Sequence, residues 1–231
     1  MALSSEQVEA YRRDGFVVAK ELYAPDTMLR WKQIMSELIA AEPKNTSGVR
    51  VWMADTIHPV LREGMKDDRV TPILRQIIGP DVEFLSAKAV FKNAATAFAS
   101  PWHQDWFYWE GATKISVWIA LDDATVANGC LKFVPGSHKK VFAKRTVRES
   151  VGFDHRITDD DLSDWPQVTV EARRGDAVFF HDLAVHSSHP NTAGTDRWSL
   201  ISTYRDAGTR DGSKVWKKPL LVAGQSVNGA A

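Results

Sequence analysis

From Pro80 onward the sequence reads as a series of short strand-like runs rich in β-branched and aromatic residues. The runs are "VEFLSAKAVFK", "WHQDWFYW", "ISVWIAL", "CLKFV", "QVTVEA", "DAVFFHDLAVH" and "RWSLISTY". Clusters of turn-forming residues, among them "DDATVANG", "RRGD" and "NTAGTD", separate these runs. Many short strands divided by such turns are typical of a β-sandwich or β-barrel. This part of the chain therefore restricts the possible folds most.

The residues before Pro80 predict helices instead. One helix runs to Asp14 and ends at Gly15, a second opens at Pro25, and a third covers roughly residues 68–78. The run "FVVA" after Gly15 predicts a short strand, and residues 44–59 predict a loop with at most one strand. Helices followed by many strands indicate the α+β class.

We expect one domain over residues 1–231. Residues 139–166 interrupt the strand rhythm with charges of both signs and are longer than an ordinary connection. This segment predicts a lid or an insertion.

The charge balance restricts the partners. There are 29 Lys and Arg against 29 Asp and Glu, so the net charge is zero, which argues against a general nucleic-acid binder. We see no signal peptide and no apolar run near the ~20 residues that cross a bilayer. The one cysteine, Cys130, allows no internal disulfide. We therefore expect a cytoplasmic protein, monomeric or homodimeric, that acts on a small molecule away from membranes.

The run "WHQD" carries the first candidate metal ligands. On a strand, His103 and Asp105 would point to the same face, because side chains alternate with a period of two. They would offer one imidazole and one carboxylate to an ion. Two histidines and one carboxylate form the ligand set of non-haem Fe(II) oxygenases. An isolated H-x-D pair is weak evidence, so a third ligand is needed.

Three histidines crowd the later segment "FFHDLAVHSSHPNTAGTDRW". His181 lies within an apolar strand, where a half-buried, hydrogen-bonded role is expected, and His189 precedes a proline and should lie in a turn. His186 closes the strand, eleven residues before Arg197. If the residues between them form the turn of a hairpin, Arg197 lies beside His186. A guanidinium there could bind a carboxylate in bidentate fashion.

The order of these motifs resembles a known family. "WHQD", "SVWIALDDATVANGCLKFVPGSHK" and "HSSHPNTAGTDR" follow one another as in the phytanoyl-CoA dioxygenase-like enzymes, which are Fe(II)- and 2-oxoglutarate-dependent oxygenases. The opening "YRRDGFVVAKELYAPDTMLRW" is also similar, so the resemblance spans about residues 7–204. It implies a double-stranded β-helix (a jelly-roll, cupin-like core) with N-terminal helices packed on one sheet. The chain departs from the family in "SSHPN", where a glycine is common.

The resemblance also implies site residues. His103, Asp105 and His186 would bind the iron. Arg197 would bind the distal carboxylate of 2-oxoglutarate with help from the Ser188 hydroxyl. Two more would serve the co-substrate, namely Trp118, which would lie near it, and Lys92, which resembles a family lysine upstream of the H-x-D motif. Without the resemblance, Trp118 would be read as core and Ser188 as a turn former.

The implied reaction uses Fe(II), 2-oxoglutarate and O2, and yields succinate and CO2 while a substrate is hydroxylated or oxidatively cyclised. Asp105 argues against halogenation, since halogenating relatives replace this carboxylate with a small residue. The chain has no basic cluster for the phosphates of a CoA ester. A small natural-product or secondary-metabolite substrate is therefore expected.

Strand parity and position suggest which residues meet that substrate. Phe107 and Trp109 would share the face of the metal ligands, while Trp102, Trp106 and Tyr108 would pack on the other side. The expected barrel mouth adds further residues from the 45–58 loop and the C-terminal stretch: Arg50, Trp52, Met53 and Trp216.

Two other functions remain open at this stage. A cupin-type metalloprotein with another metal and no 2-oxoglutarate would give Arg197 no purpose. A non-catalytic binding member of the fold would tend to lose a ligand, whereas this chain keeps the full set. A hydrolytic zinc site is weaker still, because no motif places a general base.

Overall fold

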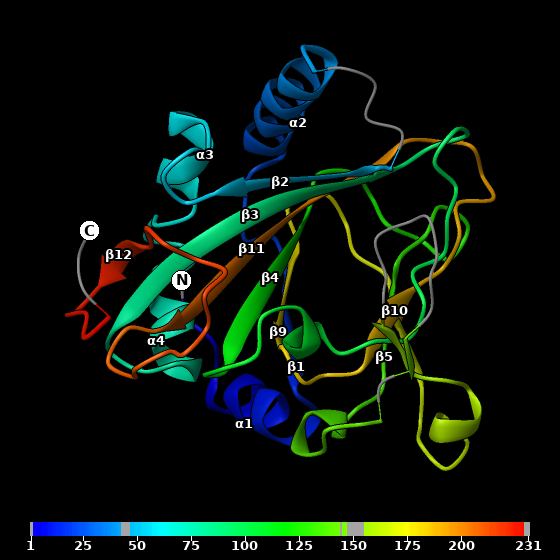
Figure 1. Ribbon diagram of the computed structural model, residues 1–231. Helices are drawn as coiled ribbons and strands as arrows, with labels where there is room; N and C mark the ends of the chain where they lie inside the picture. The colour runs from blue at the N-terminus through cyan, green and yellow to red at the C-terminus, as the bar shows by residue number, and fades with distance from the viewer. Residues whose placement is uncertain (1, 43–46, 144, 147–154, 229–231) are drawn as a thin grey trace.

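The computed structural model describes residues 2–42, 47–143, 145–146 and 155–228, and within them two antiparallel sheets face one another (Figure 1). The large sheet has the order β1 (Phe16–Ala19), β9 (Ala177–His181), β4 (Lys114–Ala120), β11 (Arg197–Asp206), β3 (Val82–Lys92) and β12 (Leu220–Ala223), and β2 (Val49–Met53) also pairs with β3. The small sheet has the order β10 (His186–Ser188), β5 (Leu131–Phe133) and β8 (Val168–Val170). The sandwich expected from the second half of the sequence is present.

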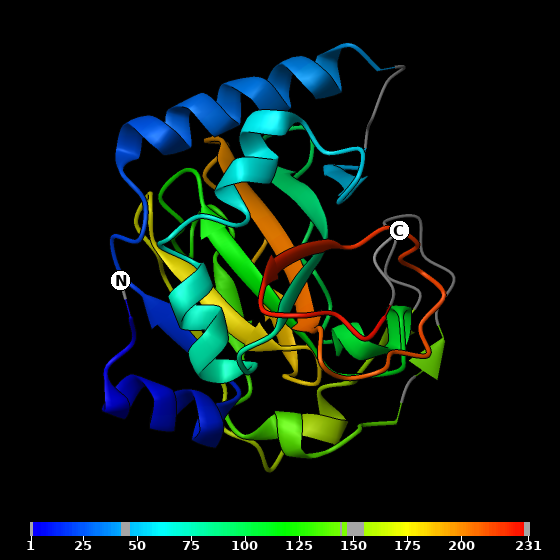
Figure 2. The same ribbon diagram turned by 90° about the vertical axis from the view of Figure 1, so that its left-hand side faces the viewer.

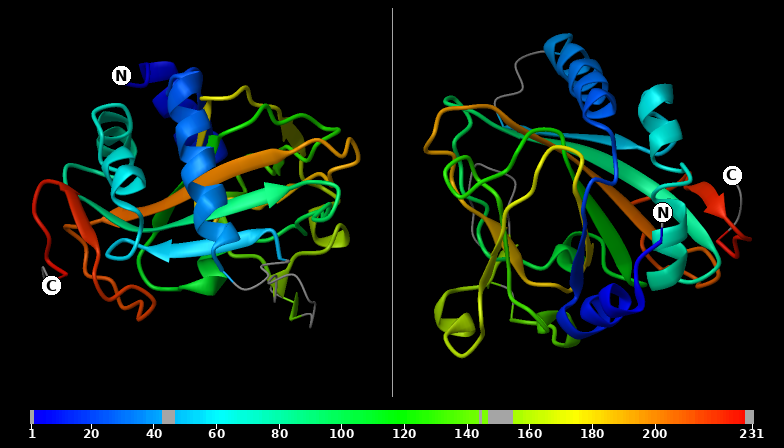
Figure 3. Two further views of the ribbon diagram at one scale, coloured as in Figure 1. Left: turned by 90° about the horizontal axis from the view of Figure 1, so that it is seen from above. Right: turned by 180° about the vertical axis from the view of Figure 1, so that it is seen from behind.

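Helices cover the outer face of the large sheet. They are α1 (Ser5–Asp14), α2 (Pro25–Ala40), α3 (Pro59–Gly64) and α4 (Thr71–Ile77), and Figure 2 shows them together on one side. Helix α2 crosses the strands (Figure 3, left), and its buried Met28, Trp31 and Met35 join a core with outward-facing residues of β3 such as Ala87 and Ala89. The helices at α1, α2 and α4 were expected; α3 was not, and α4 is shorter than its apolar pattern suggested.

The inner faces of the two sheets meet in a second core. Trp118, Phe180 and Ile201 from the large sheet pack with Leu131 and Phe133 from the small one. Strand alternation separates the two cores, because one face of each large-sheet strand meets helices and the other meets the small sheet. Any site between the sheets is thus lined by the inward-facing positions.

The run "WHQDWFYW" is not a strand, contrary to the sequence prediction. His103 forms an isolated bridge with His186, and the chain then turns into a 3-10 helix, η1 (Asp105–Tyr108). The turn is stabilised from outside the segment, since the amide of Trp106 donates to the carbonyl of Asp182 at 3.1 Å. Strand parity therefore does not apply after Asp105.

The predicted hairpin between His186 and Arg197 is also wrong. Strand β10 belongs to the small sheet and pairs with β5, whereas β11 belongs to the large sheet and lies between β3 and β4. The connection therefore crosses from one sheet to the other.

The segment 139–166 contains a two-stranded pair, β6 (Arg145–Thr146) with β7 (His155–Arg156), and the 3-10 helix η3 (Asp160–Leu162). Residues 144 and 147–154 lie outside the described residues, so the lid stays a prediction, as does the single domain. Among the helices described, none is both long and apolar enough to cross a membrane.

Candidate metal centre

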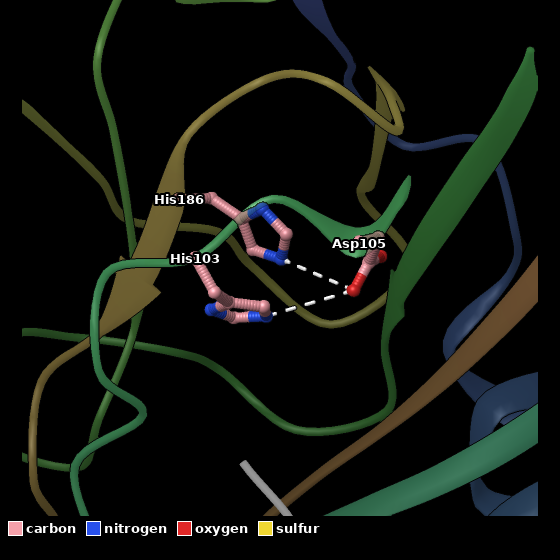
Figure 4. A group of neighbouring side chains, drawn as sticks. All are labelled: His103, Asp105 and His186. Atoms are coloured by element: carbon pink, nitrogen blue, oxygen red, sulfur yellow. Dashed lines mark ion pairs between the residues drawn. The ribbon is translucent and has the colours of Figure 1, made fainter. Parts of the chain in front are cut away.

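Three side chains converge on one point between the sheets (Figure 4). His103, Asp105 and His186 each direct a ligand atom to it, and these atoms lie within 4.8 Å of one another. The Nε2 atoms of His103 and His186 lie 3.5 and 4.0 Å from Asp105 Oδ1, and the two imidazole centroids are 4.1 Å apart. All three residues are buried.

The backbone sets this convergence. His103 and His186 exchange two N–H to carbonyl hydrogen bonds of 3.0 Å, so they face each other as a cross-strand pair and their side chains project to the same side. The 3-10 turn then brings Asp105 toward them. The residue between the ligands is anchored: the Gln104 amide donates to the carbonyls of Lys140 and Leu183 at 2.7 Å each and accepts from Phe142 N at 3.0 Å. The turn that carries both ligands is therefore fixed.

The outer nitrogens of the two imidazoles select the tautomer. His103 Nδ1 lies 2.8 Å from the carbonyl of Pro101, and His186 Nδ1 lies 3.0 Å from that of Ala184. A carbonyl only accepts, so each Nδ1 carries the proton and each Nε2 directs a lone pair toward Asp105. Burial lowers the pKa of His186 to about 3, with the neighbouring His103 acting in the same direction. His186 is therefore neutral at neutral pH, as a metal ligand must be.

The carboxylate completes the donor set. Asp105 Oδ2 accepts from the Ser116 hydroxyl at 3.3 Å, while Oδ1 is buried and has no hydrogen-bond partner among the described residues. Burial by itself would raise the pKa of Asp105, but Lys88, His186 and His103 outweigh it, and the pKa lies well below its ordinary range. Two imidazole lone pairs and a lone carboxylate oxygen around one point fit a divalent first-row metal ion.

Arg197 forms a second polar group at the start of β11. Its guanidinium is buried (1% exposed); it donates to Ser199 Oγ at 3.0 Å and to the carbonyl of Gly129 at 2.8 Å, and its Nε has no partner. Burial lowers the pKa of Arg197 to about 10, which leaves it charged at neutral pH. Its recorded hydrogen bonds within the described residues go to neutral oxygens. A buried cation in this state is costly and fits an anionic ligand.

Lys92 and Ser188 lie beside this guanidinium. Lys92 Nζ donates to Ser188 Oγ at 2.8 Å and to the carbonyl of His189. Burial, and then the charge of Arg197, lower the pKa of Lys92 to about 6. Trp118 lies under the guanidinium, whose carbon is 5.6 Å from the ring centroid. The four residues predicted for 2-oxoglutarate therefore lie together; their role remains a prediction.

One cavity of about 480 Å³ joins the two groups. Its lining includes the three converging residues together with Ser188, Trp118 and Arg197. The remaining wall is mostly apolar and aromatic: Val49, Val51, Met53, Val90, Tyr108, Trp109, Leu131, Phe180, Ile201, Val215 and Trp216. The volume falls in the range of small-molecule sites.

Some of the residues predicted to bind the substrate line this cavity and others do not. Trp109 and Trp216 line the cavity and pack on each other, with ring centroids 5.3 Å apart. Phe107 is not among the residues that line it; its ring packs against His155 and Trp106, at 6.0 and 5.6 Å between centroids. Tyr108, expected to be packing, takes the place at the cavity. The assignment of Phe107 from strand parity is therefore wrong.

Arg50 and Trp52 were also placed wrongly. They lie on β2, where alternation directs Val49, Val51 and Met53 into the cavity. Trp52 is buried in the core on the outer face, and Arg50 forms an ion pair with Glu42 at 2.6 Å. Residues 44–59 were predicted to be a loop with at most one strand; the alternation within "VRVWM" was the signal that could have separated the two faces.

Lys88 is a cavity residue that sequence reasoning missed. It lies on β3 and lines the cavity with Ser86 and Val90. Positions 86, 88 and 90 share a face with Lys92 by strand alternation. That parity was visible in "VEFLSAKAVFK" and could have identified Lys88.

The comparison with known families identifies the family to which a chain with this site belongs. The sequence model of the phytanoyl-CoA dioxygenase family matches residues 11–199, which is most of the chain. The chain belongs to the phytanoyl-CoA dioxygenase family. A curated family relative, an ectoine dioxygenase from Bordetella parapertussis, is 25% identical over 232 residues, covering 88% of this chain and 75% of that protein.

Solved structures support the fold of this family member. The non-haem, 2-oxoglutarate-dependent carbocyclase SnoK from nogalamycin biosynthesis matches with a TM-score of 0.73 at 24% identity, covering 89% of this chain and 85% of that one. The epimerase SnoN, solved with Fe3+, 2-oxoglutarate and nogalamycin RO, matches with a TM-score of 0.75 at 23% identity, covering 97% and 95%. The expected α+β jelly-roll fold is confirmed.

Membership of the phytanoyl-CoA dioxygenase family also confirms the expected class of activity. The chain is an enzyme, an Fe(II)- and 2-oxoglutarate-dependent oxygenase, and its cofactors are iron and 2-oxoglutarate. The residues at the site fit both: the buried N,N,O donor set suits the metal, and the buried guanidinium suits a dicarboxylate.

Proposed function

We propose that this enzyme hydroxylates or oxidatively cyclises a small natural-product substrate and releases succinate and CO2 from 2-oxoglutarate. One observation carries the proposal. A buried N,N,O donor set and a buried guanidinium that forms no ion pair with a carboxylate of the described residues open into the same mostly apolar cavity. A metalloprotein that does not use 2-oxoglutarate would leave the charge of Arg197 unbalanced.

The proposed roles follow from the contacts. His103, Asp105 and His186 hold the iron through Nε2, Oδ1 and Nε2. Arg197 would bind the distal carboxylate of 2-oxoglutarate, since its buried Nε has no hydrogen-bond partner among the described residues. The Ser188 hydroxyl accepts from Lys92 and donates to Ser100 Oγ in this structure, and it would have to turn its proton from Ser100 to reach that carboxylate. These residues orient the co-substrate at the buried end of the cavity, where Arg197 and Ser188 are 1% and 3% exposed.

The bound iron supplies the activation of dioxygen that accompanies oxidation of 2-oxoglutarate. The chain's own part would be to supply the imidazoles of His103 and His186 and the carboxylate of Asp105 as ligands, with His186 neutral and Asp105 charged. The aromatic wall of Trp109 and Trp216 excludes water and holds the substrate against the centre.

The substrate class rests on the cavity and on the relatives. A cavity of about 480 Å³ with mostly apolar walls suits a small organic molecule. SnoK and SnoN act in nogalamycin biosynthesis, and SnoN was solved with nogalamycin RO. These neighbours and the apolar wall support a secondary-metabolite substrate.

The proposal is tested by 2-oxoglutarate turnover without added substrate. The purified enzyme, given Fe(II), 2-oxoglutarate and O2, should form succinate slowly, and His186→Ala should abolish both Fe(II) binding and succinate formation. His181→Ala and His189→Ala are matched controls from the same segment and should retain both. Loss in a control with retention in His186→Ala would show that the metal ligands are wrongly assigned.

A further inference from the structure

Lys88 is a cation beside the metal centre for which the proposed roles have no use. It lies on β3 opposite Val51 of β2 and Ile201 of β11, lines the cavity and is partly exposed. Among the described residues its recorded charged neighbour is Asp105, whose Oδ1 lies 3.9 Å from Lys88 Nζ. This distance is longer than a hydrogen bond, so the ammonium keeps its donors for another group.

When the other charges in the cavity are summed, no net negative charge remains to neutralise the Lys88 ammonium. The charged side chains that line the described cavity are Lys88, Asp105 and Arg197. Under the proposed function, the charges of Fe(II), 2-oxoglutarate, Asp105 and Arg197 cancel, and Lys88 remains as an excess positive charge. Lys92, which lies behind Ser188, could only add to this excess. A partly exposed ammonium whose recorded ion partner, Asp105, also serves the metal favours an additional anionic partner.

We propose that Lys88 binds a carboxylate of the substrate, which is therefore an apolar molecule that carries one acid group. This inference rests on the proposed function and narrows its substrate class. A single ammonium matches a single negative charge, which favours a carboxylate over a phosphate dianion. The Ser86 and Thr203 hydroxyls line the same cavity and can add hydrogen bonds.

The rest of the wall fits the apolar part of such a substrate. Trp109 and Trp216 form an aromatic surface, and exposed Val51, Met53 and Val215 lie among the lining residues. Because Lys88 Nζ lies 3.9 Å from an oxygen of a metal ligand, the acid group binds next to the centre. The carbon that is oxidised is then close to the carboxylate along the substrate.

Lys88 could instead serve only to hold Asp105. In that case Lys88→Met would weaken Fe(II) binding and would change the affinities for charged and neutral ligands alike. If Lys88 recognises the substrate instead, Lys88→Met should weaken the binding of carboxylates and leave Fe(II) binding and the affinity for neutral ligands unchanged.

The experiment uses the full chain loaded with Fe(II) and 2-oxoglutarate in the absence of oxygen. Two matched pairs without an indole ring serve as probes, phenylpropanoate with phenylpropanamide and cyclohexylacetate with cyclohexylacetamide. Binding is followed by tryptophan fluorescence, since Trp109 and Trp216 line the cavity. The wild type should bind at least one carboxylate about tenfold more tightly than its amide, because a charged hydrogen bond is replaced by a neutral one.

Lys88→Met should remove this preference, and Lys88→Arg should retain it. Lys218→Met is the matched control, since Lys218 is an exposed lysine two residues after Trp216 and should leave the preference unchanged. The proposal is overturned if no carboxylate binds the wild type more tightly than its amide, or if Lys88→Met keeps the preference. The visible absorption band of bound Fe(II) and 2-oxoglutarate is recorded first. Its absence from the wild type would refute the proposed function, whereas its presence without a Lys88 effect would refute the present inference alone.

Discussion

Replacing Arg197 by Met should weaken 2-oxoglutarate binding strongly while leaving the unliganded fold nearly as stable. The guanidinium is 1% exposed and has an unpaired Nε, so a carboxylate that binds it gains a desolvated, bidentate partner. Truncating one partner of such a pair costs ~2–5 kcal/mol. The dissociation constant should therefore rise by about thirtyfold to a few thousandfold.

In the protein without ligand, the substitution has two opposing effects on stability. Arg197→Met removes the hydrogen bonds to Ser199 Oγ and to the Gly129 carbonyl, worth about 0.5–1.5 kcal/mol each. It also removes a fully buried charge that makes no ion-pair contact with the described residues, which offsets that loss. The melting temperature without ligand should change little, whereas the stabilisation that 2-oxoglutarate confers on the wild type should disappear.

The assay is an anaerobic titration of the Fe(II)-loaded protein with 2-oxoglutarate, read by visible absorption, together with melting curves at fixed ligand concentration. Arg197→Lys keeps the charge without the planar fork and should lose less affinity than Arg197→Met. Arg173→Met, at an exposed arginine, is the control for a general loss of charge. An unchanged dissociation constant in Arg197→Met would refute the reasoning from the buried guanidinium.

Three further predictions concern the surroundings of the centre. Gln104→Ala removes three side-chain hydrogen bonds, so urea denaturation should show a free energy of unfolding lower by roughly 2–4 kcal/mol. Fe(II) binding should also weaken, and unchanged metal affinity would refute the anchoring role. The pKa of His186 is about 3 in the folded protein and about 6.5 when unfolded. The metal-free protein should therefore lose stability as the pH falls below about 6.5. Melting curves of His186→Asn should depend less on pH in that range. Tyr108→Ala should weaken the binding of phenylpropanoate, while Phe107→Ala should not, and the reverse would restore the strand-parity assignment.

The sequence predicted the site best where regular strands carry it. The inward positions of β3, β4 and β11 follow the period of two, so Trp118 and Arg197 line the cavity together. The same rule applied to β3 would have found Lys88. Both residues were predicted from the family resemblance, and strand alternation is the physical reason that they face the same cavity.

The misplaced residues depend on contacts from distant segments. The turn after His103 is held by the Asp182 carbonyl and by the side chain of Gln104, so local sequence could not show that Phe107 rotates away. Arg50 and Trp52 were misplaced for another reason. Their segment was expected to be mainly a loop, whereas it forms the strand β2 by pairing with β3. The crossing between His186 and Arg197 likewise reflects membership of two sheets, which a hairpin pattern conceals.

A crystal structure of the enzyme prepared without oxygen with Fe(II) and 2-oxoglutarate tests the central claim most directly. Anomalous scattering from iron should place one metal within bonding distance of His103 Nε2, Asp105 Oδ1 and His186 Nε2. The distal carboxylate of 2-oxoglutarate should lie against the guanidinium of Arg197. Iron at any other group of residues, or a co-substrate whose distal carboxylate does not contact Arg197, would contradict the account.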